Sequence, residues 1–173
     1  MKKTALLIID VQKDYFPGGR SELYHAVEAE NAVLSLIEDC RKSDMPIIYM
    51  QHIQPEGSSF LAEGTPGIEI EDRIRPEEGD IVIVKHHPNS FLETPLDDVL
   101  KENSVEKLIV CGMMTHMCVD TTVRRAYDLG YEVDLAASAC ATKDLYYRGE
   151  RIVASQVQDS FLAAIDGTFA TVI

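Results

Sequence analysis

The stretch V-C-G-M-M-T-H-M-C-V-D, residues 110–120, combines the end of a strand, a turn and the start of a helix. The apolar run at its beginning stops at Gly112, and apolar residues recur at helical spacing from Cys118 as far as Gly130. This pattern places Cys118 in the first turn of a helix, where unpaired N–H groups and the helix dipole favour a thiolate and could hold an oxyanion. A cysteine there is more often a small buried apolar residue, so a catalytic interpretation needs partners elsewhere in the chain.

Strand and helix patterns alternate along the rest of the sequence. Apolar runs of strand length lie at 5–9, 47–50, 81–84, 108–111, 133–137 and 169–173. Helical patterns lie between them, at 29–40, from Thr94 onward and at 153–164. This alternation predicts a single α/β domain over residues 1–173, with three layers and a mainly parallel, Rossmann-like six-stranded sheet. The Gly- and Pro-rich stretch 51–79 is predicted to be a long loop, and such loops tend to be functional.

The composition argues against several kinds of partner. A formal net charge of −13 over 173 residues disfavours binding to nucleic acid or to an anionic membrane. No apolar run approaches the length of a membrane span, and the N-terminal run is too short for a secretory signal, so we expect a cytoplasmic protein. The four cysteines form no C-x-x-C pair, which argues against a disulfide framework and against a thiolate metal site.

Three residues of complementary chemistry are predicted at one edge of this sheet. Asp10 ends the first strand, Lys85 ends the third, and Cys118 follows the fourth. A cation there would stabilise a thiolate, and a carboxylate could pass a proton to a leaving amine. The same pattern is compatible with an Asp–Lys ion pair at the sheet edge and a cysteine that is merely packed.

Several motifs, taken in order along the chain, resemble those of one enzyme family. They are D-V-Q-K-D-Y-F at 10–16, T-P-G-I-E-I at 65–70, K-H-H-P-N-S-F at 85–91, G-M-M-T-H-M-C-V at 112–119 and T-V-R-R-A-Y-D-L-G-Y at 122–131. Over nearly its whole length the chain resembles the isochorismatase-like cysteine hydrolases, which include nicotinamidases, N-carbamoylsarcosine amidase, and ureide and biuret hydrolases. The resemblance implies that Asp10, Lys85 and Cys118 form a catalytic triad. It also implies a small-molecule substrate and a homo-oligomer, either a dimer or a tetramer.

A mechanism follows from the same resemblance. It implies a cis peptide bond between Met113 and Met114, which turns the backbone N–H of Met114 toward that of Cys118 to form an oxyanion hole. Cys118 would attack an amide-type carbonyl to give a thioester. Asp10 would protonate the leaving amine and then activate water, while Lys85 would keep the thiol acidic.

Other residues near the predicted site are candidates for contact with the substrate. Gln12 and Phe16 closely follow the catalytic aspartate and could line the substrate pocket, although Phe16 could equally be core and Gln12 could bond a loop backbone. His86 and His87 lie just after the third strand, and two exposed loop histidines are the simpler interpretation. His116 lies two residues before the thiol on a turn, so it is expected to point elsewhere.

The sequence departs from the family pattern at a position that concerns metal binding. Nicotinamidases of this family carry a D-x-H metal motif with a further histidine, and the motif falls here on His52-Ile53-Gln54, which lacks the carboxylate and the second imidazole. Zinc would want three protein ligands, so we expect no metal, no other cofactor, and His52 as a loop or pocket histidine. Cys118 favours C–N cleavage over the vinyl-ether hydrolysis of the siderophore and phenazine isochorismatases, which lack that cysteine. A non-catalytic binding or assembly relative is the other alternative, and an intact triad argues against it.

Overall fold

The computed structural model describes residues 2–173, and its main sheet has six strands. They are β1 (Thr4–Ile9), β2 (Ile47–His52), β3 (Ile81–Lys85), β4 (Lys107–Met113), β5 (Glu132–Ala141) and β8 (Thr171–Val172). The strands lie in the order β3-β2-β1-β4-β5-β8, and every neighbouring pair is parallel. The predicted six-stranded parallel sheet is therefore confirmed, and the carboxyl ends of its strands share one edge.

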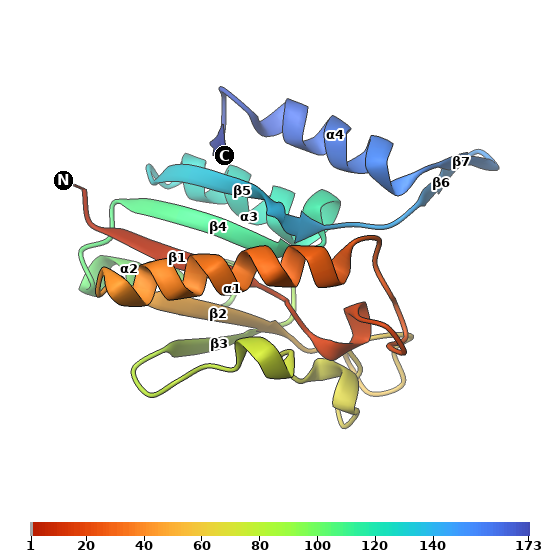
Figure 1. The fold of residues 1–173 in the computed structure, drawn as a ribbon, viewed down its shortest axis with the longest axis horizontal. Coiled ribbons are helices and arrows are strands. Elements are labelled where there is room, and N and C mark those ends of the chain that lie inside the picture. Colours follow the sequence, from red (N-terminus) through yellow and green to blue (C-terminus); the bar gives the residue numbers. More distant parts are fainter. Residues whose placement is uncertain (1) are drawn as a thin grey trace.

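Helices cover both faces of this sheet, which gives the predicted three-layer α/β fold. They are α1 (Ala26–Lys42), α2 (Leu96–Glu102), α3 (Asp120–Asp128) and α4 (Ala154–Ile165). In Figure 1, α1 lies in front of the sheet, α3 lies behind it, and α4 runs along its upper edge. Three 3₁₀ helices lie in the connections: η1 (Lys13–Tyr15), η2 (Pro66–Ile68) and η3 (Asp72–Ile74).

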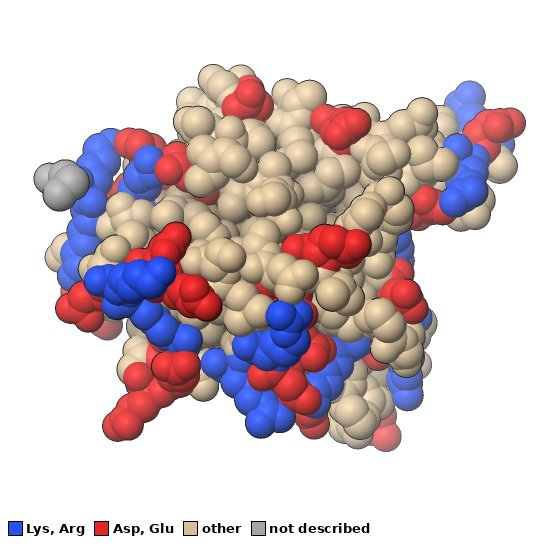
Figure 2. All heavy atoms as spheres, in the orientation of Figure 1, with Lys and Arg blue, Asp and Glu red and all other residues tan. Residues whose placement is uncertain are grey.

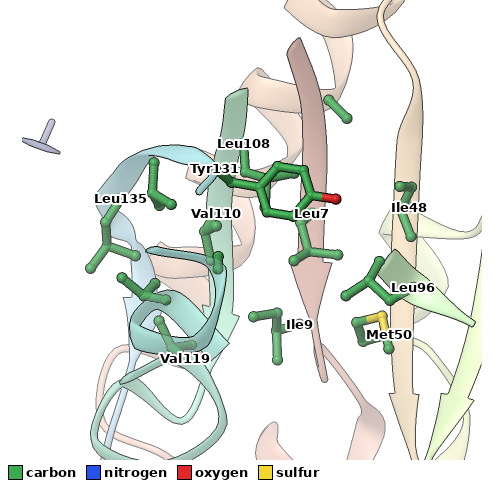
Figure 3. Close-up of a cluster of buried hydrophobic side chains, with 14 of the residues drawn as sticks. Leu7, Ile9, Ile48, Met50, Leu96, Leu108, Val110, Val119, Tyr131 and Leu135 are labelled. Carbon is green, nitrogen blue, oxygen red and sulfur yellow. The ribbon is translucent and has the colours of Figure 1, made fainter. Parts of the chain in front are cut away.

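The unbroken apolar run of β1 follows from its burial on both faces. Successive strand residues point to opposite faces, so Leu7 and Ile9 pack with residues of α2 and α3 (Figure 3). Leu6 and Ile8 pack instead with residues of α1. A central strand covered in this way reads as a continuous apolar stretch, which is why its position was evident in the sequence.

The structure differs from the prediction mainly in the C-terminal third. β5 continues to Ala141, four residues beyond its predicted end, and β8 is limited to two residues. The strands β6 (Leu145–Tyr147) and β7 (Glu150–Ile152) form an antiparallel hairpin that the sequence did not predict. These strands have three residues each and no buried residue, so they carry no apolar alternation to recognise. The hairpin projects from the body of the molecule (Figure 1).

Charged side chains are unevenly distributed on the face that carries α1. Figure 2 shows acidic and basic groups interleaved over its lower part, whereas its upper part, over α4, carries few charges. Within residues 2–173, no helix is long and apolar enough to span a membrane.

Close contact between β1 and β4 brings the two central strands together at the carboxyl edge. Gly112 pairs with Ile9, and its φ of +126° is a conformation that L side chains rarely adopt. A Cβ atom at Gly112 would lie 2.0 Å from the carbonyl oxygen of Ile9, so a side chain cannot be accommodated. The glycine thus sets the spacing between the segment that follows β1 and the segment that follows β4.

Candidate active site

Four neighbouring strands each deliver one reactive side chain to the carboxyl edge of the sheet. Asp10 follows β1, His52 is the last residue of β2, Lys85 is the last residue of β3, and Cys118 lies in the turn after β4. All four are buried. The structure thus brings together the three residues predicted to meet at this edge and adds His52. The sequence pattern predicts His52 only as a loop or pocket histidine, because the apolar run ends at Met50, whereas β2 continues for two more residues.

Lys85 is the centre of this cluster. Its Nζ atom lies 2.8 Å from Asp10 Oδ2, and the side chains of both residues are completely buried. Nζ also lies 2.9 Å from His52 Nδ1 and donates to the backbone carbonyl of His87 at 3.0 Å. Three acceptor atoms therefore match the three hydrogens of the ammonium. An ammonium that donates to Nδ1 requires a neutral imidazole, so His52 carries its ring proton on Nε2.

The thiol of Cys118 lies against the same cluster. Its Sγ is 3.8 Å from His52 Nδ1, and the ligand atoms of Asp10, His52 and Cys118 lie within 4.8 Å of one another. Burial raises the pKa of the Cys118 thiol well above its ordinary value, and the Asp10 carboxylate raises it further. The Lys85 ammonium lowers this pKa without offsetting the rise. Cys118 therefore rests as a thiol.

Asp10 is the carboxylate that lies beside this thiol. Its Oδ2 atom faces the Lys85 ammonium, whereas its buried Oδ1 atom accepts no hydrogen bond from a residue within 2–173. A buried carboxylate oxygen without a hydrogen-bond donor retains its capacity to accept a proton. Asp10 also has a φ of +52°, which is uncommon for a residue other than glycine and occurs where the chain turns out of β1.

The segment between β4 and α3 differs from the predicted helix start. The peptide bond joining Met113 and Met114 is cis, and a π-helical turn, η4 (Thr115–Val119), precedes α3. Cys118 lies within this turn rather than in the first turn of an α-helix. His116 in the same turn points away from the thiol, with its Nδ1 2.6 Å from Thr142 Oγ1.

Asp10, His52 and Cys118 are also three potential metal ligands. The Lys85 ammonium, however, lies within 2.9 Å of both Asp10 Oδ2 and His52 Nδ1, so a cation already neutralises this donor set. A metal ion bound to the same atoms would lie beside the ammonium, and the two cations would repel each other. The residues present therefore do not fit a resident metal ion.

A cavity of about 210 Å³ opens directly onto the thiol. We call it the Cys118 cavity; it is lined by Tyr15, His52, Gln54, Pro55, Phe60, His86, Pro88, Met114, Met117 and Cys118. Gln54, Pro55 and Phe60 belong to the long loop that was expected to be functional. His86 lines the cavity, whereas the ring of His87 lies 3.1 Å from the Glu93 carboxylate.

Gln12 and Phe16, which were candidates for the substrate pocket, do not line the Cys118 cavity. The side chain of Gln12 is fully buried and is occupied by backbone groups. It accepts a hydrogen bond from the His52 N–H and donates to the carbonyls of His52 and Ile68, each at 2.8 Å. Phe16 lines a separate cavity of about 710 Å³. The hydrogen bonds of Gln12 thus join the end of β2 to η2.

Replacing Gln12 with methionine is expected to lower the free energy of unfolding by roughly 2–4 kcal/mol, because the N–H and carbonyl of His52 lose their Gln12 partner and the Ile68 carbonyl loses one of its two donors. Gln51→Met is the matched control. Gln51 makes a single hydrogen bond to the same Ile68 carbonyl at 2.8 Å, and its loss should cost roughly 1 kcal/mol. Urea unfolding followed by circular dichroism measures both. An equal loss of unfolding free energy in the two variants would contradict the proposed role of Gln12 in joining β2 to η2.

A comparison with known proteins identifies the family. The family model for the Isochorismatase domain matches residues 4–172, which is nearly the whole chain. The chain belongs to the isochorismatase family. Isochorismatase-family relatives of this chain include hydrolases that act on amides.

Individual isochorismatase-family proteins resemble the chain along most of its length. The uncharacterized isochorismatase family protein YddQ of Bacillus subtilis is 43% identical over 171 residues, covering 98% of this chain and 94% of that protein. Nicotinamidase 3 of Arabidopsis thaliana is 30% identical over 154 residues, covering 82% and 74%. The crystal structure of an isochorismatase from Pseudomonas putida has a TM-score of 0.92 and 38% identity, covering 98% of this chain and 87% of that chain.

Proposed function

We propose that this protein is a cysteine-dependent amidohydrolase that cleaves a C–N bond of a small amide, ureide or lactam without a metal ion. The observation that carries the proposal is a buried thiol on the wall of a small cavity, beside a buried carboxylate–ammonium pair. Asp10, Lys85 and Cys118 are the proposed catalytic residues. The family membership and the nicotinamidase relative support an amide as the substrate.

In the first half of the proposed reaction, Cys118 attacks the carbonyl carbon of the substrate while its proton passes to Asp10. The backbone N–H groups of Met114 and Cys118 hold the oxyanion of the tetrahedral intermediate. Asp10 then gives its proton to the nitrogen, the C–N bond breaks, and the amine leaves behind a thioester on Cys118. The raised pKa of the thiol suits this order of events, since the sulfur loses its proton only as it attacks.

In the second half, water attacks the thioester and Asp10 accepts its proton. The C–S bond breaks, the thiolate takes up that proton, and the carboxylic acid product leaves. Lys85 remains an ammonium throughout. It compensates the charge of Asp10 when that residue is ionised and stabilises the sulfur when it carries negative charge.

Two other functions are weaker candidates for this chain. A vinyl-ether hydrolase of the isochorismatase type would leave the buried thiol beside Asp10 without a role. A non-catalytic binding relative would not require a carboxylate and an ammonium to be buried together, which is costly unless the pair is well matched.

The proposal includes a homo-oligomer of two or four chains in the cytoplasm. The face over α4 carries few charged groups in Figure 2, and Tyr146 and Tyr147 of the projecting hairpin are largely exposed. Both features would suit contact with another subunit.

The proposal predicts metal-independent turnover through an acyl-enzyme. Nicotinamide, ureido acids, biuret and cyclic amides are incubated with the protein and a chelator, and products are followed by proton NMR and ammonia release. Hydroxylamine, added as a competing nucleophile, should convert part of the acyl product to a hydroxamate, because it attacks the thioester. Turnover that the chelator abolishes, or turnover without any hydroxamate, would argue against a metal-free thioester route.

A further inference from the structure

The Cys118 cavity has no charged side chain on its wall. None of its ten lining residues is Lys, Arg, Asp or Glu. Lys85 lies behind the wall, where Asp10 at 2.8 Å compensates its charge, and His52 is neutral because it accepts from that ammonium. Lys143 lies 5.6 Å from the centroid of the Phe60 ring but is not part of the lining.

The polar groups that do face the cavity are neutral. Tyr15 and Gln54 both line the cavity, and within residues 2–173 neither the Tyr15 hydroxyl nor the Gln54 amide is paired with another group, so both are free for a ligand. Burial and the Asp10 carboxylate raise the pKa of Tyr15, which keeps it a phenol. The Nδ1 atom of His86 lies 2.8 Å from the Ile53 carbonyl and donates to it, so Nε2 is the ring atom left to accept. Phe60 and Met117 contribute apolar surface between these groups.

We propose that the Cys118 cavity takes small, uncharged amides and excludes amides that carry a carboxylate. This proposal rests on the proposed function and narrows its substrate class. A volume of about 210 Å³ has room for roughly seven water molecules, so the substrate is a molecule of similar bulk. The hydroxyl, amide and imidazole of Tyr15, Gln54 and His86 provide the hydrogen bonds for its polar groups.

Two physical effects act against a carboxylate in this cavity. A carboxylate must lose its hydration on entry, and no lining residue offers a cation to replace it. The net charge of −13 also lowers the concentration of anions near the surface, whereas a neutral amide is unaffected. A neutral amide exchanges its bonds to water for bonds to equally neutral side chains.

The alkylation of Cys118 tests this selectivity without a known substrate. Iodoacetamide and iodoacetate differ only in having an amide or a carboxylate. In both, the CH₂ carbon forms a bond to the Cys118 sulfur as the C–I bond breaks and iodide leaves. Rate constants at about pH 8, where histidines are generally neutral, are measured by mass spectrometry of the Cys118 peptide. We expect the ratio of the iodoacetamide rate to the iodoacetate rate to exceed that of 2-mercaptoethanol by at least roughly tenfold.

Two variants of Met117 test whether the ratio of the iodoacetamide and iodoacetate rate constants is set by the charge of the Cys118 cavity. Met117 is partly exposed at the mouth, so Met117→Lys places an ammonium there and should lower the ratio by roughly fivefold. Met117→Gln is the matched neutral control and should leave the ratio unchanged. Lys143→Gln should also leave it unchanged, and a large rise in the ratio would show that Lys143 assists anions.

A second measurement separates this proposal from the function on which it rests. Ligand-observed NMR with the Cys118→Ala protein compares butanamide with succinamate, which differ mainly in a carboxylate. Binding of butanamide alone supports the proposal, and equal or tighter binding of succinamate overturns it. Failure of Cys118 to react with either reagent would count against the nucleophile, while the NMR pair would still decide the selectivity.

Discussion

Replacing Cys118 with alanine is expected to lower turnover by at least roughly 10⁴-fold, because the proposed covalent intermediate can no longer form. The fold should persist, since the change removes one sulfur atom from a site that already borders a cavity. The measurement is kcat on whichever amide the substrate panel identifies, at saturating concentration. Turnover by the variant within a hundredfold of the wild type would rule out Cys118 as the nucleophile.

Cys40 provides the matched control for this experiment. It is buried like Cys118, but it lies in the last turn of α1, with its sulfur 3.5 Å from that of Met45. Cys40→Ala should therefore lower stability somewhat and leave kcat unchanged. A loss of turnover in both variants would indicate a general effect of removing a buried thiol instead of a loss of chemistry.

Replacing Lys85 with methionine is expected to lower the free energy of unfolding by roughly 3–5 kcal/mol, because Asp10 is left as an unpaired buried charge. Turnover should also fall by a factor of at least roughly 10², since neither the thiolate nor the carboxylate would retain its counter-charge. Chemical unfolding at neutral pH measures the first effect, and the substrate assay measures the second. Lys101→Met is the control, because Lys101 pairs with Asp97 at the surface and its loss should cost below roughly 1 kcal/mol.

The double variant Asp10→Asn/Lys85→Met distinguishes the structural contribution of the pair from its proposed chemical one. It removes both buried charges, so most of the stability lost in Lys85→Met should return. Turnover should stay low, because the variant has no carboxylate to accept the thiol proton. A double variant as unstable as the single one would mean that the loss comes from packing around the lysine stem and not from an unpaired charge.

The sequence predicted the parts of this protein that depend on local patterns. The central strands are buried on both faces and therefore appear as apolar runs, as at residues 5–9 and 47–50. Once the sheet was inferred to be parallel, the positions of Asp10, Lys85 and Cys118 relative to strand ends placed all three at one edge. Their assignment as catalytic residues, however, came from resemblance to a family and is a proposal about this chain.

Other features depend on contacts that a pattern does not contain. His52 joins the cluster because β2 continues past its apolar residues and pairs with β3, bringing His52 beside Lys85. Gln12 joins two backbone segments and does not line the pocket, because η2 folds back over the end of β1. The residue types of the long loop do not indicate this folding back. The pKa of Cys118 depends on how deeply the thiol is buried, and burial outweighs the neighbouring lysine.

The reactive groups and the cavity wall come from different parts of the fold. Asp10, His52 and Lys85 lie at the ends of β1, β2 and β3, and Gly112 fixes the spacing between β1 and β4. Much of the wall comes instead from loop residues such as Gln54, Phe60 and Pro88. Loop residues of the cavity wall can therefore change during evolution, and the substrate specificity can change with them. The strand-end residues Asp10, His52 and Lys85 meanwhile keep their positions relative to one another. A mutant library confined to loop residues such as Gln54, Phe60 and Pro88 should yield new substrate specificities with little loss of stability. A library that also changed the strand-end residues should contain many variants that do not fold.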